Sequence, residues 1–210
     1  MKRLISLSLL LAAALTAAAQ DVTLPAPATD RPTLSVMEAL RTRHSVRSYA
    51  DRAFTLQDIS DLCWAACGTS RDADHITAPS AMNRREIRLF VFTADATYEY
   101  MAATNELRHV ATGDARPLVA ASQAFAATAP VSLVMVIDFA RFGSHDERAL
   151  MMGCVDAGNV SENINLYCQA AGLCTVPRAT MDVDGIRALL HLSDEQLPIM
   201  NNPVGFPKEQ

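Results

Sequence analysis

A long helical stripe between Asp146 and Ala171 constrains the fold more than any other part of the sequence. Small and apolar residues recur there at alternating intervals of four and three, which places them on one face of a helix. The stripe consists of Leu150, Cys154, Ala157, Ser161, Ile164, Cys168 and Ala171. Because most of these side chains are small, another element can approach the helix closely. Gly172 follows directly and predicts where the helix ends.

Four apolar runs predict strands beside this helix. Ile87–Phe92 is rich in β-branched and aromatic residues. Val131–Ile137 is almost continuously apolar, which is typical of a strand that is buried on both faces. Shorter strands are expected at Cys174–Arg178 and Pro203–Phe206. The pattern as a whole predicts an α+β fold with the long helix at its centre.

Capping residues and apolar spacing predict the remaining helices. Ser35 or Thr33 caps a short helix, and Glu38 completes a capping box with Ser35. A second helix covers Leu56–Ala66 and ends at Gly68. Further helical signals cover Tyr98–Asn105, Pro117–Ala127 and Asp182–Leu190.

Residues 1–20 have the features of a cleavable signal peptide. A positively charged start precedes an apolar run that ends in small residues, and we expect cleavage near Ala19 or Gln20. The run is short for a membrane span, so an uncleaved anchor is the less favoured interpretation and no stable membrane anchor is expected. We therefore expect an exported protein, periplasmic if the source is Gram-negative. Residues 21–33 read as a Pro-rich linker, and residues 34–210 as one domain.

Charge and cysteine content exclude some classes of function. The chain has 18 Lys and Arg against 23 Asp and Glu, a net charge of −5, which does not suggest nucleic-acid binding. Five cysteines leave at least one unpaired. Cys63 and Cys67 share a helical face, where a disulfide is possible but strained, and core packing is the favoured role for most of the five. No His or Cys cluster has zinc-site spacing, so no metal site is predicted.

The segment Arg43–Tyr49 concentrates the residues with the clearest chemical potential. In extended backbone, the alternate positions Arg43, Ser45 and Arg47 aim their side chains at one face. Guanidinium groups suit bidentate recognition of phosphate. The spacing therefore indicates a site for a phosphorylated ligand. A solvated basic turn after a helix fits the same spacing.

This segment resembles the N-terminal signature of the nitroreductase-like flavoproteins, in which it binds FMN. Four further motifs follow in the family's order: a Pro-Ser-rich loop, an amide before the second long strand, the stretch after an Ala-Gly-Leu turn, and a closing Gly-Phe-Pro strand. The resemblance spans about residues 34–208. It assigns to the flavin, besides the basic segment, Pro79, Ser80, Ala81, Asn83, Gln123, Arg178, Ala179, Thr180 and Lys208.

The resemblance also implies individual roles. Arg43, Ser45 and Lys208 would bind the phosphate, and His44 would bind the flavin through its backbone or ring. Arg47 would lie near the N1/O2 edge, where a cation stabilises the negative charge of reduction. It would be the residue with a catalytic effect, with no dedicated acid or base.

In the same assignment, Gln123 would meet the pyrimidine edge of the flavin, and the backbone of Arg178, Ala179 and Thr180 would lie beside its redox-active nitrogen. The chain departs from the family pattern in two places. Many relatives have an acidic residue and a glycine where this chain has Ala179 and Thr180. Classical members also have a longer basic tail, so Lys208 indicates a subgroup with a short one.

The resemblance implies a nitroreductase-like fold, with a mixed or antiparallel sheet of four to five strands surrounded by helices. It implies a homodimer with FMN at the subunit interface and a ping-pong cycle from NAD(P)H to an electron-poor acceptor such as a nitroaromatic or quinone. Nicotinamide cofactors are scarce outside the cytoplasm, so another reduced carrier is an alternative electron donor. Alternatives are a flavin dehydrogenase acting on a peptide or small molecule, an exported flavin-binding or ligand-binding protein without turnover, and an interaction domain without a cofactor.

Overall fold

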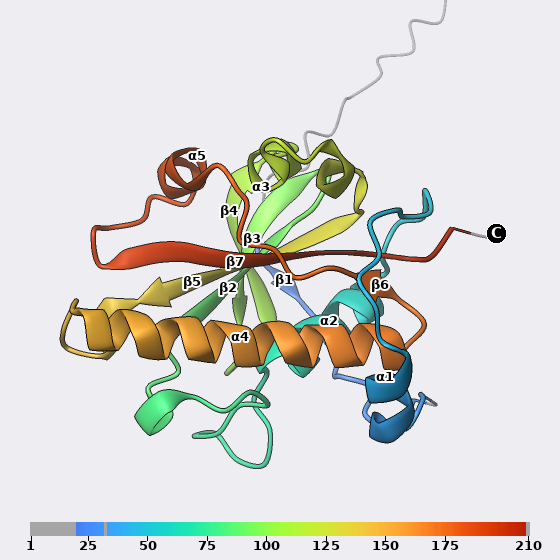
Figure 1. Cartoon of the computed structure of the whole chain (residues 1–210), viewed down its shortest axis with the longest axis horizontal. Helices are drawn as coiled ribbons and strands as arrows, with labels where there is room; N and C mark the ends of the chain where they lie inside the picture. Colours follow the sequence, from blue (N-terminus) through green and yellow to red (C-terminus); the bar gives the residue numbers. More distant parts are fainter. Residues whose placement is uncertain (1–19, 32, 209–210) are drawn as a thin grey trace, which may run out of the picture.

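A computed structural model describes residues 20–31 and 33–208, which form one sheet with helices on both faces (Figure 1). Within this part of the chain, the sheet contains seven strands in the order β1-β4-β3-β2-β5-β7-β6, and all neighbouring strands are antiparallel. The signal-peptide prediction falls outside the described residues, apart from Gln20.

The strands are β1 (Val22–Thr23), β2 (Ile87–Phe92), β3 (Ala96–Met101), β4 (Glu106–Thr112), β5 (Val131–Asp138), β6 (Cys174–Thr175) and β7 (Gln196–Gly205). The α-helices are α1 (Val36–Thr42), α2 (Leu56–Cys67), α3 (Arg116–Ala120), α4 (Glu147–Ala170) and α5 (Val183–Leu189). Short 3-10 helices occur at η1 (Ala81–Asn83), η2 (Ala124–Thr128) and η3 (Phe139–Arg141).

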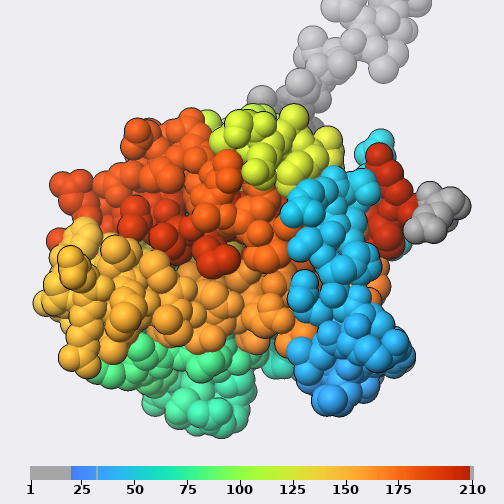
Figure 2. Space-filling view, viewed as in Figure 1, coloured from blue at the N-terminus to red at the C-terminus, as the bar shows by residue number. Residues whose placement is uncertain are grey.

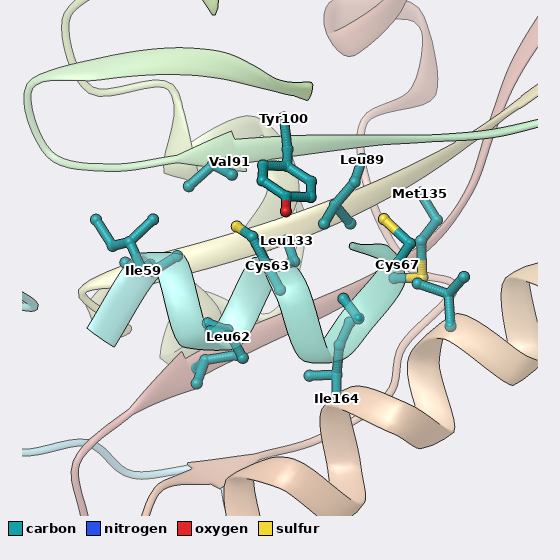
Figure 3. Close-up of a cluster of buried hydrophobic side chains, with 14 of the residues drawn as sticks. Ile59, Leu62, Cys63, Cys67, Leu89, Val91, Tyr100, Leu133, Met135 and Ile164 are labelled. Atoms are coloured by element: carbon teal, nitrogen blue, oxygen red, sulfur yellow. The ribbon is translucent and has the colours of Figure 1, made fainter. Parts of the chain in front are cut away.

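The strand β5 is buried along almost its whole length, as its continuous apolar sequence predicts. Leu133 and Met135 pack in a cluster with Ile164 of α4 and with residues of α2 (Figure 3). Val134 and Val136 belong to a second cluster, which includes residues of α3 and α5. Both faces of β5 are therefore covered by helices.

Helix α2 has the predicted start and packs its cysteines into the core. The side chain of Thr55 accepts the N–H of Asp58, and the carboxylate of Asp58 accepts the N–H of Thr55, which completes a capping box. Cys63 and Cys67 are buried free thiols in the cluster of Figure 3. Their role is therefore the predicted one of small core residues.

The sheet is larger than the predicted four to five strands for two reasons. First, Val22 and Thr23, in the segment that reads as a linker, pair with β4 as an edge strand. Second, the helical prediction for Tyr98–Asn105 is wrong, because β3 and β4 form an antiparallel hairpin there. Tyr100 and Leu107 join the core from the two strands, so burial of one hairpin face decides the structure.

Other boundaries also differ from the predictions. The expected helix Pro117–Ala127 is divided into α3 and η2 because Ala121 adopts a positive φ of 46°. The strand expected at Cys174–Arg178 covers two residues only, whereas the strand expected at Pro203–Phe206 begins at Gln196. Helices α1, α4 and α5 match their predicted positions closely.

Helix α4 approaches the sheet as closely as its small side chains suggest. The Asp146 carboxylate caps its start by accepting the N–H of Ala149 at 2.8 Å. A Cβ atom on Gly153 would lie 2.7 Å from Cδ1 of Ile137 in β5, so glycine is required for this contact. No helix in the described part of the chain combines the length and apolarity needed to cross a membrane.

We expect Gly153→Ala to destabilise the protein by about 1 kcal/mol. Overpacking against Ile137 costs about 1–3 kcal/mol, which exceeds the gain of about 1 kcal/mol in helix propensity. Urea unfolding at a fixed protein concentration measures the change. In a double-mutant cycle, Ile137→Val is expected to relieve part of this cost. Strictly additive free energies of unfolding would contradict the contact.

Candidate functional site

The segment Arg43–Tyr49 follows an extended path that neighbouring strands hold in place. The N–H of Val46 donates to the carbonyl oxygen of Thr175 in β6 at 3.0 Å. The buried hydroxyl of Tyr49 lies 3.3 Å and 3.4 Å from the carbonyl oxygens of Val46 and Pro203. The backbone of the segment is therefore fixed along β6 and β7.

Arg43, Ser45 and Arg47 present exposed side chains from this fixed backbone. None of the three side chains forms a hydrogen bond or ion pair with another described residue. The Nδ1 atom of His44 lies 3.1 Å from the carbonyl oxygen of Thr42. In Figure 2 the segment lies on the surface, in light blue, beside the orange and red C-terminal part of the chain. Two guanidiniums and a hydroxyl with unused donors fit an anionic group such as phosphate.

A buried arginine holds the predicted amide of Gln123. The Nε of Arg178 donates to Oε1 of Gln123 at 2.9 Å, and its Nη1 donates to Oδ1 of Asn201 at 2.7 Å. Its remaining hydrogen bonds go to the carbonyl oxygens of Val119 and Ala120. Burial lowers the pKa of the Arg178 guanidinium. No described carboxylate lies within ion-pair distance of it.

Phe125 joins this amide to the basic segment. It packs against the cluster that contains Tyr49 and Cys174, and its ring centroid lies 5.5 Å from the Arg178 guanidinium carbon. Val46 packs against the same cluster. Three predicted segments that are distant in sequence, around Val46, Gln123 and Arg178, thus meet at one corner of the sheet.

The backbone around Arg178 offers fewer donors than predicted. The N–H of Arg178 donates to the carbonyl oxygen of Asn201 at 2.8 Å, so this N–H is not free for a ligand. Ala179 and Thr180 are exposed, and their N–H groups donate to no other described residue. Donors for a ligand therefore remain at two of the three predicted positions.

The C-terminal cation Lys208 has a neighbour that the sequence did not single out. Lys208 is exposed and lines a surface hollow together with Arg52 and Phe206. The Arg52 guanidinium stacks over the Phe206 ring at 3.7 Å. Arg52 lies outside the spaced motif, so only its place in the fold brings it beside Lys208.

The Pro-Ser-rich loop lies elsewhere in the chain. Pro79, Ser80, Ala81 and Asn83 lie in and beside η1, which follows the green-teal loops below α4 in Figure 1. The segment Arg43–Tyr49 lies on the right of the same view, at the C-terminal end of α4. A single chain therefore does not bring this loop to the other predicted residues.

Two buried carboxyls hold this loop against α4. The N–H of Ala81 donates to Oδ2 of Asp156 at 2.5 Å, and the hydroxyl of Ser80 donates to Oε2 of Glu86 at 3.1 Å. Glu86 is fully buried, and its Oε1 has no hydrogen-bond partner among the described residues. Burial, reinforced by the nearby carboxyl of Asp156, raises the pKa of Glu86 to about 7.

Sequence reasoning missed Glu86 and Asp156 because neither belongs to a motif. Glu86 precedes the strand β2 and reads as a polar strand end. Asp156 lies between the stripe positions Cys154 and Ala157 of α4, and nothing in the spacing of the stripe signals its burial. No group of His, Cys, Asp or Glu suited to a metal ion occurs among the described residues.

Comparison with known proteins finds matches that agree on one family. The model of the nitroreductase family matches residues 40–206. A protein of Methanocaldococcus jannaschii that is named as a candidate nitroreductase is 25% identical over 182 residues, which are 82% of this chain and 91% of that protein.

Solved structures share the fold. A protein of Ralstonia eutropha, also named as a candidate nitroreductase, has a TM-score of 0.80 at 24% identity, with 91% of each chain covered. The NADPH:FMN oxidoreductase of Vibrio harveyi, in complex with NAD+, has a TM-score of 0.64 at 18% identity, with 83% of this chain and 69% of that chain covered. The predicted fold class is thereby confirmed.

Because Glu86 is buried, we expect its protonation to make the free energy of unfolding depend on pH. Its folded-state pKa of about 7 lies above the usual value of 4.5, so its stabilising protonation is complete in acid and is lost as the pH rises through about 7. We expect Glu86→Gln to remove this loss, which amounts to up to about 3 kcal/mol. Urea unfolding at pH 5 and pH 8 measures it. Glu147→Gln, at an exposed position, serves as the control. If the free energy of unfolding changes equally between pH 5 and pH 8 in both variants, the assignment to Glu86 is refuted.

Proposed function

This chain belongs to the nitroreductase family of oxidoreductases, and we propose that it uses FMN to transfer two electrons from NAD(P)H, or another reduced donor, to an electron-poor acceptor such as a nitroaromatic or quinone. One observation carries the proposal: a rigid segment presents Arg43, Ser45 and Arg47 with unused donors, next to the corner that holds Gln123. The name of the Vibrio harveyi structure, which shares the fold, supports the choice of cofactor and donor.

The residues present fit FMN in the following way. Arg43, Ser45 and Lys208 bind the phosphate, the first two from the rigid segment and the third from the C-terminal end of the sheet. Arg47 stabilises negative charge that develops on the ring. When bound, FMN supplies the two-electron chemistry, and the protein supplies position and electrostatics.

A homodimer is part of this proposal. The loop with Ser80 lies below α4 in Figure 1, whereas the segment with Arg43 lies at the C-terminal end of α4. A second copy of the chain is therefore needed to bring the loop of one chain to the basic segment of the other. Apolar side chains that a lone chain exposes support such an interface. They are Val36 and Met37 on α1, Met82 in the loop, and Met151 and Val155 on α4, each at least 58% exposed.

Export, which we also propose, affects the electron donor. If residues 1–20 direct the chain to the periplasm, a reduced carrier other than a nicotinamide is the physiological donor. The sequence difference at Ala179 and Thr180 favours one second candidate, a flavin-binding protein of the same fold without turnover. Anaerobic bleaching of the bound flavin by NADH or NADPH, and its reoxidation by a quinone, distinguishes the enzyme from this candidate.

Purified protein is expected to be yellow and to release FMN on denaturation, and Arg43→Ala should weaken FMN binding. One charge-assisted hydrogen bond contributes about 1.5–3 kcal/mol, which corresponds to a roughly 10- to 100-fold higher Kd. Quenching of FMN fluorescence measures the affinity of the apoprotein.

Two further variants control this experiment. Arg41→Ala removes an exposed cation of α1 that pairs with Glu38. It should change the free energy of FMN binding by about 0.5 kcal/mol or less. Arg47→Ala should slow flavin reduction more than it weakens binding. A colourless protein that ignores added FMN contradicts the proposal.

The proposed homodimer interface can be tested by a substitution on α4. Val155→Asp places a charge on the exposed apolar side of α4, so the dimer should dissociate to monomers at micromolar concentration. The change should be nearly neutral for the fold of one chain, because Val155 is 58% exposed. Analytical ultracentrifugation measures the mass. Ala188→Asp, on the exposed side of α5, should leave the dimer intact, and a dimeric Val155→Asp would show that this surface is not the interface.

A further inference from the structure

The guanidinium of Arg178 occupies an unusual environment. It is 7% exposed, and every hydrogen bond that it makes goes to a neutral oxygen. A buried cation without a carboxylate partner is costly, so a role is expected of it beyond packing. Two side chains accept hydrogen bonds from the guanidinium: Asn201 is fully buried, whereas Gln123 is partly exposed.

This contact determines which way the Gln123 amide faces. An amide can be turned over with little change in shape, which exchanges its oxygen and its nitrogen. A guanidinium has no acceptor, so Nε of Arg178 can face only the oxygen of Gln123. The amide nitrogen must then point away from Arg178. It donates to no other described residue.

We propose that Arg178 is a positioning residue that fixes the Gln123 amide with its NH2 group presented to the ligand, so that this position selects a ring carbonyl and rejects a hydrogen-bond donor. The inference rests on the proposed function, in which the flavin pyrimidine edge supplies the carbonyl. The cation also polarises the amide from behind, which strengthens the hydrogen bond that the NH2 group donates.

The proximity of the other site segments supports this role. Phe125 lies close to the Arg178 guanidinium and packs with Tyr49 and Val46, so the amide and the basic segment are held by one cluster. Asn201 holds Arg178 from the other side, through Oδ1 and through its backbone. The amide thus has a rigid support that does not itself need to touch the ligand.

Gln123→Glu is the most direct test. The carboxylate keeps an acceptor for Arg178 but removes the NH2 donor. We expect the melting temperature to stay equal or rise, and the Kd for FMN to rise roughly tenfold or more. The infrared C=O bands of bound FMN should shift to higher frequency. Ser122→Asp adds the same charge at the adjacent exposed residue and should change the Kd less than threefold.

A double-mutant cycle separates positioning from a merely structural role. Arg178→Lys keeps the charge but not the planar fork, and we expect it to weaken FMN binding. In the background of Gln123→Leu this effect should vanish, because Arg178 acts through the amide. If Arg178→Lys does not fold, the Gln123→Glu measurement decides alone.

The possible failures are distinguishable. A wild-type protein that binds no FMN refutes the proposed function. If wild type binds FMN, three results overturn the positioning role instead: unchanged affinity and C=O bands in Gln123→Glu, an equal loss in Ser122→Asp, or an Arg178→Lys effect that persists without Gln123.

Discussion

Burial of β5 on both faces is the constraint on which the rest of the structure depends. Its side chains alternate between a cluster with α2 and α4 and a cluster with α3 and α5, so helices must cover both sides of the sheet. Along its length, β5 also pairs with β7. Asn201 and Pro203 of β7 in turn hold Arg178 and Tyr49, so the candidate site takes its geometry from the centre of the sheet.

Two of the segments that we predict to bind the ligand each rely on a buried ionisable group without an opposite charge. Arg178 holds the Gln123 amide with neutral oxygens around its guanidinium, and Glu86 accepts from Ser80 in the loop on the other side of α4. In a low dielectric such groups make hydrogen bonds that are strong and selective for one arrangement. The two groups of residues lie apart in one chain, and the proposed homodimer, formed through the exposed apolar side chains of α1 and α4, would bring them together.

Residues whose local pattern agreed with their burial were predictable. The period of α4, the start of α2 at Leu56 and the apolar run of β5 are each determined by local sequence, and all three occur in the structure. The hairpin of β3 and β4 was not predictable in this way. Tyr98–Asn105 is compatible with either period in isolation, and contact with the core, through Tyr100, decides between them. Val22 and Thr23 form a strand only because β4 offers them a free edge.

The sequence by itself determined the family, the helices α1, α2, α4 and α5, the strands β2 and β5, and the basic segment, because short-range spacing and capping encode them. The tertiary structure alone decided which predicted residues meet. It placed Gln123 against Arg178, brought Arg52 beside Lys208, and put the Ser80 loop on the far side of α4. It also buried Glu86 next to Asp156. These contacts join residues that are 55 to 156 positions apart in the sequence, and only packing around a common core can bring such distant side chains together.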